Sequence, residues 1–121
     1  MITALHTLVY AEDPEAARAF FRDVLEFPGV DTGGGWLIFK TGPSERGVHP
    51  RSWEAGGTDQ QFDVSLMCDD LEATMAGLTA KGAEFAGEVT DQGWGRTIRL
   101  RVPGAGEMTL YEPKYDPPAT S

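Results

Sequence analysis

The sequence is poor in cysteine, in basic residues and in long hydrophobic runs, and each shortage narrows the class of protein. Cys68 is the single cysteine, so no internal disulfide can form, and we expect a reducing cytoplasm. Lys and Arg number 10 against 19 Asp and Glu, a net charge of −9, which disfavours nucleic-acid binding because phosphate contacts need clustered cations. No apolar run is long enough for a membrane span, and the first residues lack a signal-peptide pattern.

What remains is the composition of an ordinary globular protein. The chain has 121 residues, of which 40% are hydrophobic and 24% are charged, and this size favours one domain with a modest core. The acidic excess would concentrate a cationic small molecule near the surface, although the same charge also serves solubility alone.

The first half of the chain reads as a strand, a helix and further strands. Residues 2–10 (ITALHTLVY) alternate in the manner of a strand. Asp13 and Pro14 form a helix start, an N-cap acceptor followed by a residue suited to the first helical position. The apolar stripe of this helix comprises Ala17, Phe20, Phe21, Val24 and Leu25. A glycine turn at 33–35 precedes a strand at 36–42, and a short strand is expected around residues 46–50.

The second half repeats this order after a polar linker at 51–60. A strand at 62–68 leads to a helix that Asp69 or Asp70 caps and that Gly82 ends. Strands are expected at 83–89, 96–102 and 107–113.

The two halves match at nearly constant spacing. Setting Asp13 on Asp70 shifts the numbering by 57, and the glycine turns that end at Trp36 and Trp94 agree at a shift of 58. We therefore expect an α+β fold of two tandem βαβββ modules, a curled mixed sheet around a cleft with the helices outside. The expected divisions of this single domain are module one at 1–50, the linker at 51–60, module two at 61–113, and a frayed tail at 114–121.

Three segments resemble a known family. These are HTLVYAEDPEAARAFF, VSLMCDDLEAT with the following LTAKGAEF, and the terminal GEMTLYEP. They are similar to the vicinal oxygen chelate superfamily, also called the glyoxalase/bleomycin-resistance/dioxygenase group, and the likeness extends to Pro113. That superfamily holds isomerases, lyases, extradiol dioxygenases and non-catalytic drug-binding proteins. The resemblance also implies a homodimer.

The resemblance implies where a divalent metal would bind. Enzymes of the family take ligands from the first and last strands of each module, and His6 stands at the first of these places. Asp63 occupies the equivalent place in module two, where the family often has His. A carboxylate can bind a hard divalent ion, so this difference alone does not exclude a metal.

The last strands fit such a site poorly. The family ligand would fall at Thr109 in module two and, by a shorter alignment, at Arg46 in module one. Glu112 and His49 are the nearby alternatives, but each lies an odd number of positions away and should point to the opposite sheet face unless a bulge intervenes. No metal is therefore favoured. If a divalent ion does bind, we expect His6, Asp63 and Glu112 to hold it.

The aromatic residues suggest a pocket for a flat molecule. Trp36 and Trp94 are repeat-equivalent and each begins a strand after a glycine turn, so they can form pocket walls or merely cover a sheet edge. Trp53 lies in the linker and can serve as a lid or as a contact with a partner. The full set of expected ligand-binding residues is His6, Tyr10, Trp36, His49, Trp53, Asp63, Ser65, Trp94 and Thr109.

Two functions follow from these residues. The favoured one is a small-molecule-binding protein that sequesters an aromatic natural product or antibiotic without catalysis. The alternative is a metal-dependent lyase, isomerase or extradiol dioxygenase, in which the ion polarises adjacent substrate oxygens. Catalytic residues cannot be assigned. Ser65 and Thr109 lack a neighbouring Asp–His arrangement, and Cys68 precedes two acidic residues that would raise the pKa of its thiol.

Overall fold

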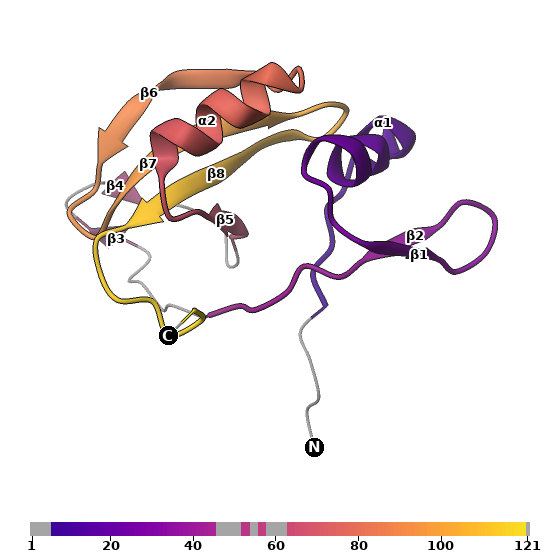
Figure 1. The fold of residues 1–121 in the computed structure, drawn as a ribbon, viewed down its shortest axis with the longest axis horizontal. Coiled ribbons are helices and arrows are strands. Elements are labelled where there is room, and N and C mark those ends of the chain that lie inside the picture. Colours follow the sequence, from indigo (N-terminus) through magenta and orange to yellow (C-terminus); the bar gives the residue numbers. More distant parts are fainter. Residues whose placement is uncertain (1–5, 46–51, 54–55, 58–62, 121) are drawn as a thin grey trace.

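The computed structural model describes residues 6–45, 52–53, 56–57 and 63–120. Its elements mix two helical segments with short and long strands, in an α+β arrangement (Figure 1). In chain order these are α1 (Pro14–Ala19), η1 (Phe20–Val24, a π-helical turn), β1 (Gly29–Asp31), β2 (Leu37–Phe39), β3 (Ser52–Trp53), β4 (Gly56–Gly57), β5 (Ser65–Met67), α2 (Leu71–Ala80), β6 (Phe85–Asp91), β7 (Gly95–Val102) and β8 (Gly106–Pro113).

Module two forms the main sheet, a four-stranded mixed sheet in the order β5-β8-β7-β6. β6, β7 and β8 are antiparallel neighbours along the chain, whereas β5 pairs with β8 in parallel, with α2 as part of the long connection. The register places Ser65 opposite Thr109 and Met67 opposite Tyr111. The strands expected at 83–89, 96–102 and 107–113 are therefore confirmed within a few residues.

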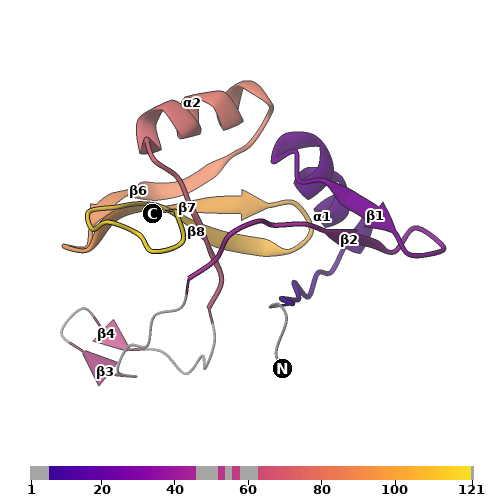
Figure 2. The same ribbon diagram turned by 60° about the horizontal axis from the view of Figure 1, so that its bottom comes forward.

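Both helices lie on one side of this sheet (Figure 2). Alternate residues of β7 and β8 face them, because side chains alternate along a strand. Ile98 and Leu110 pack with the fully buried Leu71 of α2, while Leu100 and Val102 form a second cluster with the end of α1 and η1. The helices therefore cover one sheet face and leave the other uncovered by helix.

The expected helix starts are confirmed in both halves. Asp13 caps α1 by accepting a hydrogen bond from the Ala16 N–H at 3.1 Å, and Asp70 caps α2 by accepting from the Ala73 N–H at 3.0 Å. Of the two acceptors considered for the second helix, Asp70 is thus the cap. Gly82 follows α2 with a φ of 94°, the left-handed conformation that ends many helices.

Module one is bound to module two through the start of α1. The Asp13 N–H donates to the Gly104 carbonyl at 3.0 Å, in the turn between β7 and β8. Phe20 and Phe21 are buried against the sheet, and the Phe39 ring of β2 lies tilted beside the Phe21 ring, with centroids 5.9 Å apart. The apolar side chains of module one are therefore buried by packing against the sheet of module two.

The first expected strand does not form in its described part. Residues 6–10 have no regular structure and are exposed. The physical reason is that a strand needs a hydrogen-bonded neighbour, and in the part of the chain that the structure describes none pairs with this segment. Module one keeps a hairpin of β1 and β2 around the glycine turn. The strand expected at 46–50 lies outside the described residues.

The described residues 114–120, where a frayed tail was expected, form hydrogen bonds with distant parts of the chain. The Lys114 N–H donates to the Trp94 carbonyl at 2.8 Å. Further along, the Ala119 N–H and the Tyr115 hydroxyl both donate to the Glu45 carboxylate. These long-range bonds hold the tail against Trp94 and against Glu45, which follows β2 in the chain. The linker also contains structure, since β3 and β4 pair within residues 51–60. Among the described helices, none has the length and hydrophobicity needed to cross a membrane.

Candidate functional site

The sheet face opposite the helices presents polar and aromatic side chains from three strands. Because Ile98 and Leu110 face the helices, their strand neighbours face the other way. On β7 these neighbours include Arg99, and on β8 they are Thr109 and Tyr111. Ser65 of β5 lies opposite Thr109 in the register. We call this set of residues, Ser65, Thr97, Arg99, Thr109 and Tyr111, the open face.

Arg99 organises the polar part of the open face. Its guanidinium donates to the Thr109 hydroxyl at 2.6 Å and to the Glu107 carbonyl at 3.2 Å. The Glu107 carboxylate lies 3.5 Å from the same guanidinium. The Thr109 hydroxyl accepts from Arg99 and keeps its own hydrogen available as a donor. This arrangement can orient a carbonyl or ether oxygen of a bound molecule.

An aromatic cluster adjoins these polar groups, made of Trp94, Tyr111 and Tyr115. The Trp94 and Tyr111 rings meet edge to face, with centroids 5.3 Å apart and planes at 78°. The Tyr111 and Tyr115 hydroxyls lie 2.9 Å apart, and Tyr115 donates onward to Glu45. Partial burial, followed by the bonds to Glu45 and Tyr111, raises the pKa of Tyr115, so its hydroxyl keeps its proton. Trp94 remains 37% exposed and can stack on a flat ring.

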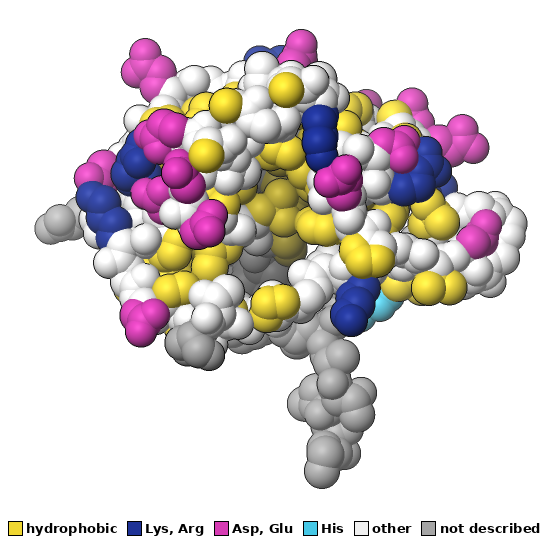
Figure 3. All heavy atoms as spheres, in the orientation of Figure 1, with side chains coloured by type: hydrophobic (Ala, Val, Ile, Leu, Met, Phe, Trp, Pro, Cys, Tyr) yellow, Lys and Arg dark blue, Asp and Glu magenta, His cyan; other side chains and the backbone are white. Residues whose placement is uncertain are grey.

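The molecular surface is hollowed on the side drawn in Figure 3, where hydrophobic side chains surround a depression near the middle. A second concavity, a groove of about 440 Å³, lies along the β1–β2 hairpin. Its lining includes Val30, Ile38 and Phe39, with Lys40 at its edge. None of the described residues predicted to bind a ligand lines this groove.

The predicted site residues of module one are not brought together in the described part of the chain. His6 and Tyr10 are exposed in the segment without strand structure, where Tyr10 reaches 86% exposure. Trp36 is 67% exposed, and the Arg18 guanidinium carbon lies 4.9 Å from its ring centroid. His49 lies outside the described residues. Trp53 is described only as a backbone position of β3.

The predicted residues of module two do assemble in part. Ser65 and Thr109 are neighbours across the β5–β8 pair. Tyr111 lies two residues beyond Thr109 on β8, and its ring contacts Trp94. Asp63 is exposed just ahead of β5. The structure thus joins three of the predicted residues, Ser65, Trp94 and Thr109, along one face.

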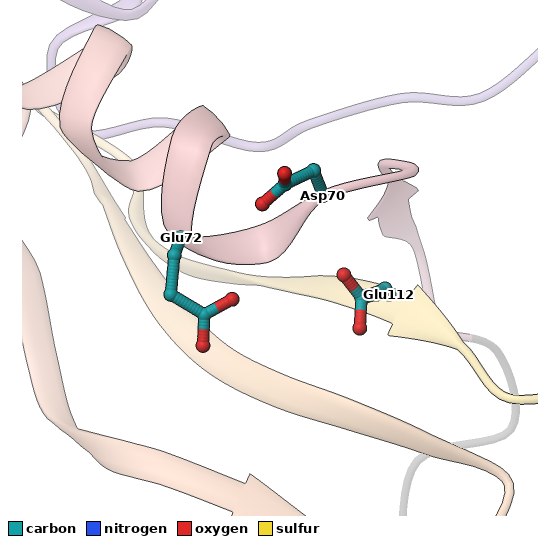
Figure 4. A group of neighbouring side chains, drawn as sticks. All are labelled: Asp70, Glu72 and Glu112. Atoms are coloured by element: carbon teal, nitrogen blue, oxygen red, sulfur yellow. The ribbon is translucent and has the colours of Figure 1, made fainter.

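The acidic residues that could hold a metal gather elsewhere, at the N-terminus of α2. Oxygens of Asp70, Glu72 and Glu112 lie within 4.8 Å of one another (Figure 4). Glu112 accepts from the Leu71 N–H at 3.0 Å and from Arg96 at 3.4 Å, and Arg96 also pairs with Glu72. The Arg96 hydrogen bond lowers the pKa of Glu72. This cluster is therefore already satisfied by a cation and a helix terminus.

His6, Asp63 and Glu112, the residues expected to hold a divalent ion if one binds, are not a group of described residues whose ligand atoms lie within 4.8 Å of one another. The Glu112 carboxylate lies on the helix-covered face, bonded to the backbone of α2, as the odd spacing from Thr109 predicted. His6 and Asp63 are exposed and form no hydrogen bond or ion pair with another described residue. For Cys68, burial foremost raises the pKa of the thiol, in the direction that the sequence predicted.

Sequence reasoning missed Tyr111, Tyr115, Glu45 and Arg99. Tyr111 had a usable signal, because it follows Thr109 by two residues on one strand and must share its face. Arg99 could have been found from its place on β7 opposite Thr109. No local signal joined Glu45 to Tyr115, since 70 positions separate them.

The fold and the open face define the class of this protein: an α+β domain of paired helix-and-sheet modules whose helices cover one face of the main sheet. Within that class, the profile of the Glyoxalase/Bleomycin resistance protein/Dioxygenase superfamily matches residues 3–113. The chain therefore belongs to this superfamily, as the sequence motifs indicated.

Solved structures agree on the fold. A lactoylglutathione lyase from Agrobacterium tumefaciens is 22% identical with a TM-score of 0.62, and the match covers 91% of this chain and 92% of that one. A superfamily member from Sphaerobacter thermophilus is 20% identical, with a TM-score of 0.61 over 92% and 98% of the two chains. TnmS3, an antibiotic-binding protein from Streptomyces sp. CB03234, is 20% identical, with a TM-score of 0.57 over 93% and 100%. Among curated proteins, no sequence matches.

Proposed function

We propose that this protein binds and sequesters a small aromatic molecule, such as a natural product or antibiotic, on its open face. The observation that supports this proposal is the joining of Trp94 and Tyr111 to the hydroxyl-bearing pair Ser65 and Thr109 on one sheet face. Ligand sites typically combine apolar and aromatic walls with a few polar groups that fix orientation.

Each group has a physical role in this proposal. The partly exposed Trp94 ring offers a flat surface that a planar ligand can cover with little loss of side-chain entropy. The Thr109 hydroxyl, held by Arg99 at 2.6 Å, orients a hydrogen bond to the ligand. The superfamily fold is shared with TnmS3, whose name describes an antibiotic-binding protein, so such a ligand suits the scaffold.

A metal-dependent lyase, isomerase or dioxygenase is the second candidate. The fold shared with a lactoylglutathione lyase favours it. Against it stands the position of Glu112, whose carboxylate is committed to Leu71 and Arg96 on the other sheet face. The enzyme proposal would need His6 and Asp63 to find a further ligand.

Calorimetric titration with planar polycyclic antibiotics, with and without a chelator, distinguishes the two. We expect binding that the chelator leaves unchanged, and Trp94→Ala should weaken it about tenfold, or about 1.4 kcal/mol, in line with the loss of one aromatic contact. Trp36→Ala is the matched control, because that ring stacks on Arg18 away from the open face, and it should bind as the unaltered protein does.

Metal analysis of untagged protein completes the test. Binding that requires added manganese, iron, zinc or nickel, and that disappears in His6→Ala, would instead support the enzyme. The binding proposal expects His6→Ala to retain its affinity for the antibiotic.

We also propose a cytoplasmic homodimer. Several apolar side chains of module one are exposed, among them Leu8 at 62% and the paired hairpin residues Val30 at 68% and Ile38 at 48%, and exposed apolar surface is common at interfaces. Sedimentation analysis should give twice the chain mass of 13.1 kDa. A monomer at micromolar concentration would contradict this.

A further inference from the structure

A partly buried carboxylate, Glu45, lies at the aromatic end of the open face. It accepts hydrogen bonds from the Tyr115 hydroxyl and from the Ala119 N–H at 3.3 Å. Both donors are neutral. In the described part of the chain, ion pairs join other acidic residues to Lys and Arg, but none of these pairs includes Glu45. The carboxylate therefore keeps an uncompensated negative charge among described groups.

The hydrogen bonds beside Glu45 run in one direction. Tyr115 uses its single hydrogen to bond Glu45, so the 2.9 Å contact between the two tyrosine hydroxyls must have Tyr111 as the donor. The chain of donors from Tyr111 through Tyr115 therefore ends at the Glu45 carboxylate. A carboxylate has about four acceptor positions, of which two are used here, so acceptor capacity remains for a ligand.

The aromatic rings of this cluster favour a cationic ligand, as the negative charge of Glu45 does. Trp94 meets Tyr111 edge to face, and Trp94 and Tyr115 are 37% and 39% exposed. Aromatic faces attract organic cations through their quadrupole, most strongly for Trp. A net charge of −9 on the protein would steer a cation toward this surface as well.

The geometry points to a recognition site for a protonated amine, formed by Glu45, Tyr115, Tyr111 and Trp94. The inference rests on the proposed function and narrows its ligand class to aromatic molecules that carry a cationic amine. The flat part of the ligand lies against Trp94, and its ammonium group donates to the free acceptor positions of Glu45. Lys114 pairs with Asp91, and Arg99 pairs with Glu107. These two basic side chains therefore do not compete with a ligand for the Glu45 carboxylate.

Two matched probes test the inference, 9-aminoacridine and acridine, which have the same ring system but are cationic and neutral, respectively, at pH 7.5. Their affinities are measured by fluorescence titration of the full chain. We expect the unaltered protein to prefer the cation, and Glu45→Gln to reduce the affinity for 9-aminoacridine about tenfold while leaving that for acridine unchanged, because only the charged amine loses a partner. Glu88→Gln removes the same formal charge from exposed β6 and should change either affinity less than about twofold.

A second variant separates charge from tail anchoring. Tyr115→Phe loses the bond that fixes the tail but retains the Glu45 carboxylate, so the preference for the cation should persist. If Glu45→Gln and Tyr115→Phe lose affinity for both probes equally, Glu45 acts only by fixing the tail and the inference is overturned, while aromatic binding stands. Equal binding of the two probes to the unaltered protein also overturns the inference alone. Failure of both probes to bind would contradict the proposed function itself.

Discussion

The two modules share a sequence pattern but differ in how completely they fold into sheet. In module two, four strands pair into one sheet, and Leu71 of α2 and Leu100 of β7 are fully buried in the packing between the sheet and the helices. In the described part of module one, only β1 and β2 pair, and Val30, Trp36 and Ile38 are exposed.

The difference shows that a repeated pattern of caps and turns does not by itself produce a repeated sheet. Both helix caps form with the same bond, because the Asp carboxylate that accepts and the backbone N–H that donates lie three residues apart. The sheet instead depends on strands from distant parts of the chain meeting, and β5 finds β8 whereas residues 6–10 find no described partner. An isolated hairpin such as β1–β2 is marginal in water, so it relies on the packing of Phe39 on Phe21.

The largest effect should come from the core of module two. Leu100→Ala removes a side chain with 0% exposure and should lower the free energy of unfolding by about 2–5 kcal/mol. Val30→Ala in the hairpin should change it by about 0.5 kcal/mol or less. Urea unfolding followed by circular dichroism measures both. A loss for Val30→Ala as large as that for Leu100→Ala would mean that the hairpin is packed in solution.

A smaller effect should come from the contact between the modules. Gly104 has a φ of 77°, and a Cβ there would lie 2.5 Å from the Asp13 carbonyl oxygen. Gly104→Ala should therefore lower the free energy of unfolding by about 2–3 kcal/mol. Gly106→Ala is the control: its φ is 83° but no atom lies within 4 Å of the added Cβ, so the loss should be only about 1 kcal/mol. Similar losses for the two variants would show that the Asp13–Gly104 contact is loose.

The smallest effect should be on the pH dependence of stability, through one ion pair in each module. Arg96 lowers the pKa of Glu72 from its ordinary 4.5. The pair therefore stabilises the fold above that value, and the stabilisation is lost as the pH falls through the lowered pKa. In Glu72→Gln, the urea midpoint should fall less between pH 7 and pH 3 than it does in the unaltered protein.

Asp23→Asn is the matched variant in module one. Its partner Arg22 also lowers the pKa of that carboxyl, but the two residues are adjacent in sequence and can interact in the unfolded chain as well. The pH dependence of its urea midpoint should therefore match that of the unaltered protein. An equal flattening in both variants would show that the sequence separation of Glu72 and Arg96, which joins α2 to β7, is irrelevant.

Part of the candidate site could be predicted from the sequence. Ser65 was identified from its repeat position and Thr109 from the place of the family's ligand, and the structure places them opposite each other. Glu112 was expected on the other face from its odd spacing, and it lies there beside Leu71. Such predictions succeed because the side-chain direction along a strand is a local property with a period of two.

The expectations that differ from the structure concern segments whose structure depends on residues far away in the sequence. The strand at residues 2–10 was expected from alternation alone, yet its described residues 6–10 have no neighbouring strand. The tail was expected to fray from its composition, yet Tyr115 and Ala119 are held by Glu45. Alternation and composition describe a segment, whereas pairing requires a second segment in the right place.

The sequence by itself determined the helix starts at Asp13 and Asp70, the glycine turns, the alternating faces of the strands and the superfamily, because each depends on residues a few positions apart or on a pattern along the chain. Only the tertiary structure decided that α1 packs on the sheet of module two and that Glu45 meets Tyr115 across 70 positions. Those long-range contacts depend on the free energy of closing long loops around a common core. No short stretch of sequence determines that free energy.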